Sequence, residues 1–314
     1  MKHFSPARLA LTILMILIGV SAFADQARAE SPFWKYRPLN ILEQSQKVAA
    51  LDWHDGGLYI AAGTLEKNDL MRYDPASGRS KLILKQWPNI SALAVSGDQA
   101  LIAGWEPAET DDQTPALRVY FAWADLTAGE VLDKIYLDLN CFKCFAYDLE
   151  KMDGRRFAAS IPGQNKVIFL AVDDQNRLRL EGEVSGLREA KGLCWHEGRL
   201  YVGGSARVDH QTRGAVYVVG DDFSVAESFK VMESRGALNS LGIRDNRLIA
   251  VNFHNYKLMS NSVLVIDLPT QKVIAEITDL PRTTARFCFR DGRAFSADFA
   301  NHEITEMEFN FQDQ

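Results

Sequence analysis

Several features that mark other protein classes are scarce in this sequence. Its 314 residues include only four cysteines, too few for a disulfide-based scaffold. Acidic residues outnumber basic ones by 41 to 35, and no basic stripe is interleaved with aromatic residues, which argues against nucleic-acid binding. The Gly-x-Ser-x-Gly elbow, the phosphate-binding loop and the His-Glu-x-x-His zinc motif are missing. The composition therefore describes an acidic chain without a familiar catalytic motif.

The start of the chain has the form of a secretory signal peptide. Lys2 and Arg8 precede an apolar run, and small residues at Ala24 and Ala29 offer cleavage positions. The run is about 12 residues long, against roughly 20 for a bilayer span, and no cysteine follows it for lipid attachment. We expect residues 1–24 to be removed, with cleavage after residue 29 as the alternative. The mature protein should be soluble and periplasmic, and losing two cations leaves 41 acidic against 33 basic residues.

A hairpin pattern recurs six times along the rest of the chain. In KGLCWHEGRLYVGG, residues 191–204, two apolar stretches flank a short charged turn. The six copies align without gaps, and in each a leading apolar residue is followed by another apolar residue eight positions later. Their turns contain Gly, Asp or Asn, which tolerate the positive φ of tight hairpins. The leading residues are Leu51, Leu93, Leu149, Leu193, Leu241 and Phe287.

The spacing of the hairpins predicts a propeller. The intervals between leading residues are 42, 56, 44, 48 and 46, and a third and a fourth strand follow each of the first five hairpins. Such periods with four strands per repeat are typical of a β-propeller. The sixth repeat has only three strands, so we predict that WKYRPLNILEQ, residues 34–44, completes it, with Pro38 on an edge strand. The fold is predicted to be all-β, one six-bladed β-propeller over residues 33–314 whose last four-stranded blade is closed by the N-terminal strand.

The hairpins also carry a family resemblance. The segments GRLYVGG (198–204) and GGLYIAAG (56–63) resemble the inner hairpins of secreted bacterial propellers with Tyr-Val-Thr-Asn-type repeats. The count of six blades is similar to that of gluconolactonase-like and NHL-type propellers. The Gly-His and Trp-Asp marks of WD40 repeats are missing. The resemblance implies a fold, and for a lactonase-type member it implies carboxylates and amides from several blades around an axial divalent ion.

One face of the predicted propeller should carry the binding residues. There the first strands start and the second strands connect to the third, and binding residues concentrate on such loops. The candidate ligand-binding residues are Asn89, Glu189, Lys191 and Asn239 near the axis, with His210, His254 and His302 further out. The three histidines fall in corresponding loops of blades four to six and could converge on a transition metal, or polar loops contain them by chance. We assign no metal site.

The cysteines suggest two different environments. Cys141 and Cys144 form a Cys-x-x-Cys that is read as a local disulfide, with inert thiols or a metal or redox pair as alternatives. Phe145 occupies the place of the His that covalent haem attachment requires. Cys194 and Cys288 occupy equivalent positions in blades four and six, too far apart for a disulfide, so we predict buried free thiols.

Aromatic residues align at one position of three first strands. Trp53, Trp195 and Phe289 each stand two places after the leading apolar residue. We interpret this alignment as packing of one blade against another, and not as a ligand-stacking site.

Three functions follow from these observations. The preferred hypothesis is an exported monomeric binding or scaffold protein that recognises a small molecule, a peptide or a periplasmic partner on its loop-rich face. A metal-dependent lactonase or esterase using Glu189, Asn89 and Asn239 is the second, although Ala190 and Lys191 stand where the resembled family has Gly-Pro. A redox or cofactor-biogenesis accessory using Cys141 and Cys144 is the third. The cofactor is unknown, with a divalent metal as a candidate.

Overall fold

The structure is a computed structural model. It describes residues 34–39, 41–42, 46–64, 66–108, 116–137, 145–255, 260–278, 284–290, 293–298 and 303–309. Residues 36–308 form one compact unit. Within the described ranges, no helix has the length and apolar character needed to cross a bilayer.

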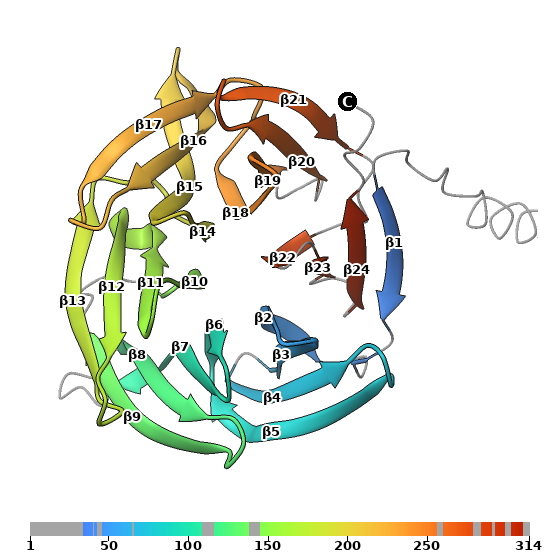
Figure 1. Cartoon of the computed structure of the whole chain (residues 1–314), viewed down its shortest axis with the longest axis vertical. Coiled ribbons are helices and arrows are strands. Elements are labelled where there is room, and N and C mark those ends of the chain that lie inside the picture. Colours follow the sequence, from blue (N-terminus) through green and yellow to red (C-terminus); the bar gives the residue numbers. More distant parts are fainter. Residues whose placement is uncertain are drawn as a thin grey trace, which may run out of the picture. The chain divides into compact units, whose positions relative to one another are not determined.

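Six four-stranded antiparallel sheets form the blades of a propeller (Figure 1). Blade 1 consists of β2(Lys47–His54), β3(Gly57–Gly63), β4(Lys67–Asp74) and β5(Arg79–Pro88), and blade 2 of β6(Ile90–Ser96), β7(Gln99–Ala108), β8(Ala116–Asp125) and β9(Glu130–Leu137). Blade 3 consists of β10(Asp148–Lys151), β11(Arg156–Ile161), β12(Lys166–Val172) and β13(Leu178–Ser185), with the 3-10 turn η1(Pro162–Gln164) between β11 and β12. Blade 4 consists of β14(Leu193–His196), β15(Arg199–Val208), β16(Gln211–Val219) and β17(Val225–Val231), and blade 5 of β18(Leu238–Arg244), β19(Arg247–Asn255), β20(Ser260–Asp267) and β21(Lys272–Ile277). The sixth combines β22(Thr284–Arg290), β23(Arg293–Asp298), β24(Glu303–Phe309) and β1(Trp34–Leu39). The predicted six-bladed all-β architecture is confirmed.

The sixth blade is closed by the N-terminal strand, as predicted. The sheet order is β1-β24-β23-β22, so β1 is the outermost strand. Glu306 of β24 accepts hydrogen bonds from Arg37 Nε of β1 at 3.1 Å and from Arg293 Nη1 of β23 at 3.0 Å. Pro38 is exposed on this edge strand, the part of a sheet where proline is tolerated. One carboxylate thus ties three strands of the closing blade together.

The turns of the inner hairpins have the backbone that their sequences predict. In blade 4, Glu197 and Gly198 have φ of 48° and 73°, as a two-residue turn with both central residues at positive φ requires. Blade 3 departs from the gapless alignment. Its ladder pairs Lys151 with Phe157, whereas blade 4 pairs Trp195 with Leu200, so the blade-3 turn holds one residue more. Phe157 therefore corresponds to Leu200, and the ungapped alignment of this copy is wrong.

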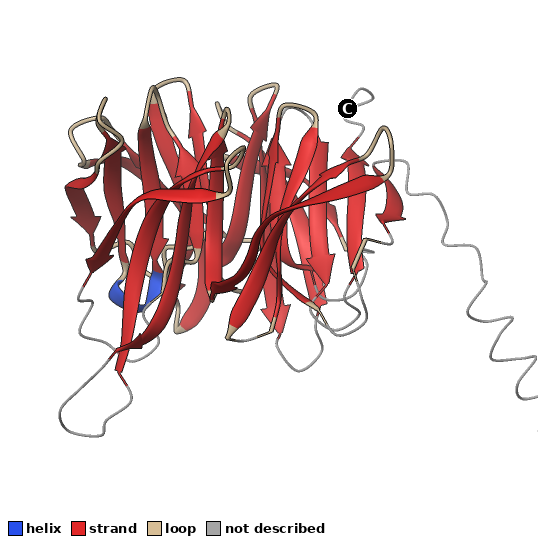
Figure 2. Ribbon diagram, turned by 90° about the horizontal axis from the view of Figure 1, so that it is seen from below, coloured by secondary structure: helices blue, strands red, loops and turns tan. Residues whose placement is uncertain are grey.

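The antiparallel order fixes which loops share a face. Each inner strand starts at one face, which we call the upper face, and returns through the second strand, so the connection from second to third strand lies on that same face. The turns between first and second strands, and between third and fourth, lie at the opposite face. In Figure 2 the strands cross the thickness of the propeller and the loops gather at its two ends. His54 and His196 end first strands and so lie at the opposite face.

Apolar side chains fill the spaces between blades. The leading residue Leu149 packs in a cluster that joins blades 2 and 3, and Trp123 meets Phe157 there with 5.5 Å between ring centroids. Between blades 6 and 1, Trp53 stacks on Phe295 at 5.0 Å. Each buried large side chain contributes roughly 1.5–3 kcal/mol relative to exposure. Packing between blades therefore holds the ring together.

The other two aligned aromatic residues also face a neighbouring blade. Trp195 packs against the cluster between blades 3 and 4. Phe289 of blade 6 lies over Gly242 of blade 5 so closely that a Cβ on the glycine would be 2.3 Å from its ring. The predicted role of these aligned aromatics in packing is confirmed.

Carboxylates add polar contacts between the inner strands. Asp52 on β2 is only 4% exposed, and its two oxygens accept the backbone N–H groups of Trp53 at 2.8 Å and of Val95 in blade 2 at 2.6 Å. One carboxylate therefore satisfies a backbone donor in each of two adjacent blades. Hydrogen bonds to an ionised acceptor are stronger than neutral ones.

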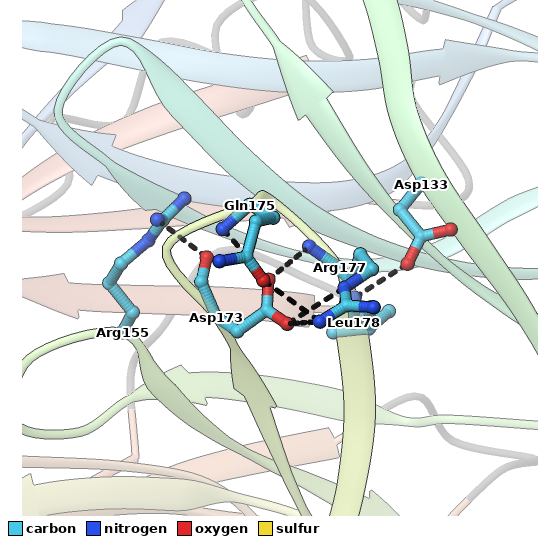
Figure 3. Close-up of polar contacts among 6 residues, drawn as sticks. All are labelled: Asp133, Arg155, Asp173, Gln175, Arg177 and Leu178. Atoms are coloured by element: carbon cyan, nitrogen blue, oxygen red, sulfur yellow. Dashed lines mark hydrogen bonds and ion pairs between the residues drawn. The ribbon is translucent and has the colours of Figure 1, made fainter.

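A second carboxylate contact joins the outer strands of blades 2 and 3 (Figure 3). Asp133 of β9 accepts the backbone N–H of Leu178 at 2.6 Å, where β13 begins. The preceding turn is held by Asp173, whose carboxylate accepts the backbone N–H and the Nε of Arg177, each at 2.9 Å. Arg155 donates to the carbonyl of Asp173 at 2.9 Å. The turn is thus fixed before β13 meets its neighbour.

Candidate functional site

The inner strands share an irregularity near the upper face. In blades 1, 2, 5 and 6 the ladder skips one residue, the residue two positions before the leading apolar one. In blades 3 and 4 the inner strand begins only after this position, at Asp148 and Leu193. Bulges re-aim side chains and are frequent next to functional sites. We call this the axial position, and its occupants are Ala49, Ser91, Tyr147, Lys191, Asn239 and Ala285.

A cavity is lined by two of the axial residues, Ser91 and Tyr147, and by their neighbours on the inner strands. It is lined by Ala50, Leu51, Ser91, Ala92, Leu93, Tyr147, Asp148, Ser240 and Phe287, which come from five blades. Its volume of about 20 Å³ suits roughly one water molecule. An organic ligand therefore has to lie above it, with at most a small group reaching in. We call the region around this cavity at the upper face the axial mouth.

Lys191 and Asn239 meet at the axial mouth from adjacent blades. Lys191 Nζ donates to Asn239 Oδ1 at 3.1 Å and lies 5.8 Å from the centroid of the Tyr147 ring. Burial lowers the pKa of the Lys191 ammonium, and the nearby charge of Glu189 opposes that shift. The backbone of Lys191 is fixed as well, because its N–H donates to Gly203 at 2.7 Å. The predicted residues Lys191 and Asn239 are therefore held close together.

Glu189 occupies a turn beside Lys191. It is half-buried and has a φ of 50°, a conformation that side-chain-bearing residues seldom adopt. Its N–H donates to Asn165 Oδ1 at 2.8 Å, and the turn is closed by the bond from Ala190 N to Leu187 O. Asn165 belongs to blade 3, so a neighbouring blade sets the position of Glu189. Strained turns of this kind are found where a side chain has to be aimed.

Asn89 has a different setting from the other predicted axial residues. It is buried, and its carbonyl accepts the Tyr120 hydroxyl at 3.1 Å and the Trp105 N–H at 3.1 Å. Trp87 Nε1 in turn donates to the Tyr120 oxygen at 2.8 Å. These contacts bind Asn89 into blade 2. No described contact joins Asn89 to Lys191, and the described contacts do not assemble the metal set of the hydrolase hypothesis.

Three residues around the axial mouth were missed by the sequence reasoning. Tyr147 stacks beside Lys191, while Ser91 and Ser240 line the cavity. The signal was present, because Ser91 and Tyr147 stand at the same offset from the leading residue as Lys191 and Asn239.

The three predicted histidines do not form a described cluster. His210 is exposed at the tip of a hairpin, His254 lies in β19 with its side chain outside the described part, and His302 lies outside the described residues. In the ranges that the structure describes, no group of three or more His, Cys, Asp or Glu side chains is placed to hold a metal ion.

The loop predicted around His210 is corrected by the structure, which has a hairpin there. Strands β15 and β16 continue pairing as far as Val208 and Gln211, leaving only Asp209 and His210 as the turn, with φ of 47° and 63°. The arms project beyond the core with solvent on both sides, so polar residues occupy them without the alternation typical of a half-buried strand. His210 is therefore carried away from the axis.

The cysteines divide between described and undescribed parts of the chain. Cys141 and Cys144 lie outside the described residues, so their disulfide stays a prediction. Neither Cys194 nor Cys288 forms a disulfide within the described residues, as predicted. Cys288 is buried, with Sγ 3.9 Å from Asp52 Oδ1, whereas Cys194 is only partly buried, which corrects that part of the prediction.

Comparison with known proteins gives a fold likeness. No family model matches the chain, and no curated protein matches it. Among solved structures, it is similar to streptogramin B lyase with 10% identity and a TM-score of 0.54, covering 88% of this chain and 98% of that one. A chain of a mitotic checkpoint complex is 10% identical with a TM-score of 0.56, and the match covers 88% of this chain and 95% of that one. Sqt1 of Saccharomyces cerevisiae is 9% identical with a TM-score of 0.51, and the match covers 88% of this chain and 98% of that one. At such identities the likeness establishes the β-propeller fold alone.

Proposed function

We propose that this protein is an exported, monomeric binding protein of the periplasm that holds a small molecule or a peptide at its axial mouth. One observation carries the proposal. Hydrogen-bonding side chains occupy the axial position in four consecutive blades, as Ser91, Tyr147, Lys191 and Asn239, whereas blades 6 and 1 have alanine there. Polar groups gathered beside apolar walls are the usual composition of a ligand site.

The fixed geometry of these residues supports binding. Asn239 is 7% exposed and accepts the Lys191 ammonium, while the carbonyl of Lys191 accepts the Ser160 hydroxyl at 2.6 Å. Groups that are already ordered lose little conformational entropy when a ligand arrives. Leu51, Leu93 and Phe287 provide the apolar wall of the cavity. A ligand with one polar end and one apolar part fits this distribution.

The fold likeness does not establish the activity, which has to be inferred from the residues of the site. The similar structures include a lyase and a member of a checkpoint complex, so propellers of this general shape serve catalysis and assembly alike. For this chain the described polar residues suit recognition. Export and the periplasmic location rest on the N-terminal sequence, with its cationic start and short apolar run.

Mass spectrometry of protein purified from the periplasm of its own host tests the proposal. Under denaturing conditions the mass reports cleavage after residue 24 or 29, and a loss of two hydrogens maps to Cys141 and Cys144 if they are paired. Under native conditions we expect a bound small molecule or peptide on the wild type. The bound mass should disappear in Lys191→Met and persist in Lys85→Met, an exposed lysine on β5. A bare native mass for all three proteins would refute the binding proposal.

A further inference from the structure

The axial mouth holds a partly buried cation, Lys191. Lys191 Nζ has three N–H donors, and its hydrogen bond within the described part of the chain goes to the neutral amide oxygen of Asn239. No ion pair joins it to a described carboxylate. Burial disfavours its charged form, as its lowered pKa shows. A partly desolvated ammonium without an anionic partner is stabilised when an anion binds.

The two acidic residues nearby do not fill this role. Asp148 lines the cavity, but its Oδ1 accepts the N–H of Leu149 at 3.0 Å and its Oδ2 accepts that of Leu193 at 2.9 Å. That carboxylate therefore joins blades 3 and 4. Glu189 raises the pKa of Lys191 through its charge without reaching ion-pair distance. The charge of Glu189 favours the protonated amine, and neither carboxylate forms an ion pair with Lys191 among the described contacts.

Asn239 presents a second donor beside the first. Its Oδ1 accepts from Lys191, which leaves the amide Nδ2 of the same group as a donor without a hydrogen bond to the described residues. The amide and the ammonium come from adjacent blades, so two N–H donors are available side by side. A carboxylate has two oxygens to receive two such donors.

We propose, on the basis of the binding function above, that the ligand group read by Lys191 and Asn239 is a carboxylate carried on an apolar chain. One oxygen accepts from Lys191 Nζ and the other from Asn239 Nδ2. The apolar part then lies toward the side of the mouth formed by Leu51, Leu93 and Phe287. The carboxylate belongs either to a small monocarboxylic acid or to the C-terminus of a peptide.

Titration calorimetry with matched probes tests the carboxylate. Hexanoate is compared with hexanamide, and N-acetyl-dialanine with its C-terminal amide, because each pair differs only in the anionic group. We expect at least one acid to bind about ten-fold or more tightly than its amide, since hydrogen bonds to charged groups contribute about 1.5–3 kcal/mol. The pair that shows the preference identifies the source. Equal affinities within both pairs, or binding by neither acid, would overturn the proposal.

Variants assign the preference to this site. Lys191→Met and Asn239→Leu should each remove the acid preference, and Lys85→Met should keep it. Lys191→Gln, which keeps a donor without the charge, serves if the methionine variant does not fold. An acid preference that survives the loss of Lys191 contradicts the proposal. Inorganic phosphate serves as a further probe. Equal affinity of the wild type for phosphate and hexanoate would show general anion attraction and would also contradict the carboxylate proposal.

The pH dependence gives a readout that a structural role would not produce. Only the protonated amine attracts the carboxylate, so acid affinity should fall as pH rises through the pKa of Lys191, below the ordinary range of lysine. Hexanamide affinity should stay constant over the same range. A host-purified protein that carries a ligand without a carboxylate would overturn this inference and leave the binding function intact, whereas bare protein without acid binding refutes both.

Discussion

Replacing Asp52 with Asn should weaken the joint between blades 1 and 2. The carboxylate accepts two backbone N–H groups, at 2.8 Å and 2.6 Å, and is almost fully buried. Asn has one acceptor oxygen, so its amide N–H₂ would face either Trp53 N–H or Val95 N–H. An unsatisfied buried donor costs about 1–3 kcal/mol, and the remaining bond loses its charge assistance, which is worth about 1 kcal/mol more. We expect a destabilisation of about 2–4 kcal/mol.

Thermal unfolding followed by circular dichroism measures this effect. For a chain of this size the change corresponds to a fall in Tm of roughly 5–15 °C. Asp98→Asn is the matched control, because Asp98 is an exposed residue in the inner hairpin of blade 2. Exposed substitutions usually stay within about 0.5 kcal/mol. If Asp52→Asn and Asp98→Asn unfold at the same temperature, the carboxylate does not join the blades energetically and the reasoning fails.

Three further substitutions test other parts of the fold. Glu306→Gln should lower Tm by roughly 1–3 °C, more at low salt than at high salt, because the ion pair with Arg37 is largely exposed; a salt-independent Tm would contradict this. Hydrogen bonding from the backbone of Arg177 lowers the pKa of Asp173, so its stabilisation is present above the ordinary Asp pKa and is lost as pH falls through the lower folded value. Asp173→Asn should therefore flatten the acid-side fall of the urea midpoint, and an unaltered curve would count against the turn. Gly104→Ala would place a Cβ 1.9 Å from the carbonyl oxygen of Asn89 and should lower Tm by several degrees; an unchanged Tm would refute that contact.

The fold was predictable because its determinants are local. A hairpin turn such as Glu197-Gly198 needs residues that adopt positive φ, and the apolar residues on either side mark the paired strands. Repetition of the same pattern then gave the blade count, and the missing fourth strand of the last repeat identified β1 as its partner. The one-residue insertion in the turn of blade 3 was invisible, because a shift by one still places an apolar residue, Phe157, in the expected column.

The site was less predictable because it depends on departures from regular pairing. The bulge that sets Asn239 aside from its ladder has no sequence mark of its own, and alanine occupies the same position in blade 1. Tyr147 was missed although its offset matches that of Lys191. The residues around His210 were predicted to form a loop, but they belong to the paired ends of β15 and β16. The sequence does not show this, because a hairpin exposed on both sides needs no apolar alternation.

The allocation of charge within the ring supports a binding role for its centre. Asp52, Asp148 and Glu150 are acidic residues of inner strands, and each accepts a backbone N–H from the next blade, at Val95, Leu193 and Trp195. These carboxylates are engaged in holding neighbouring blades in register, so they are not the counter-ions of Lys191. Relocating one of them toward the amine would neutralise it at the expense of a contact between blades. A ring built in this way keeps its central cation open to an anion from outside, which is the condition that the calorimetric comparison of acid and amide probes measures.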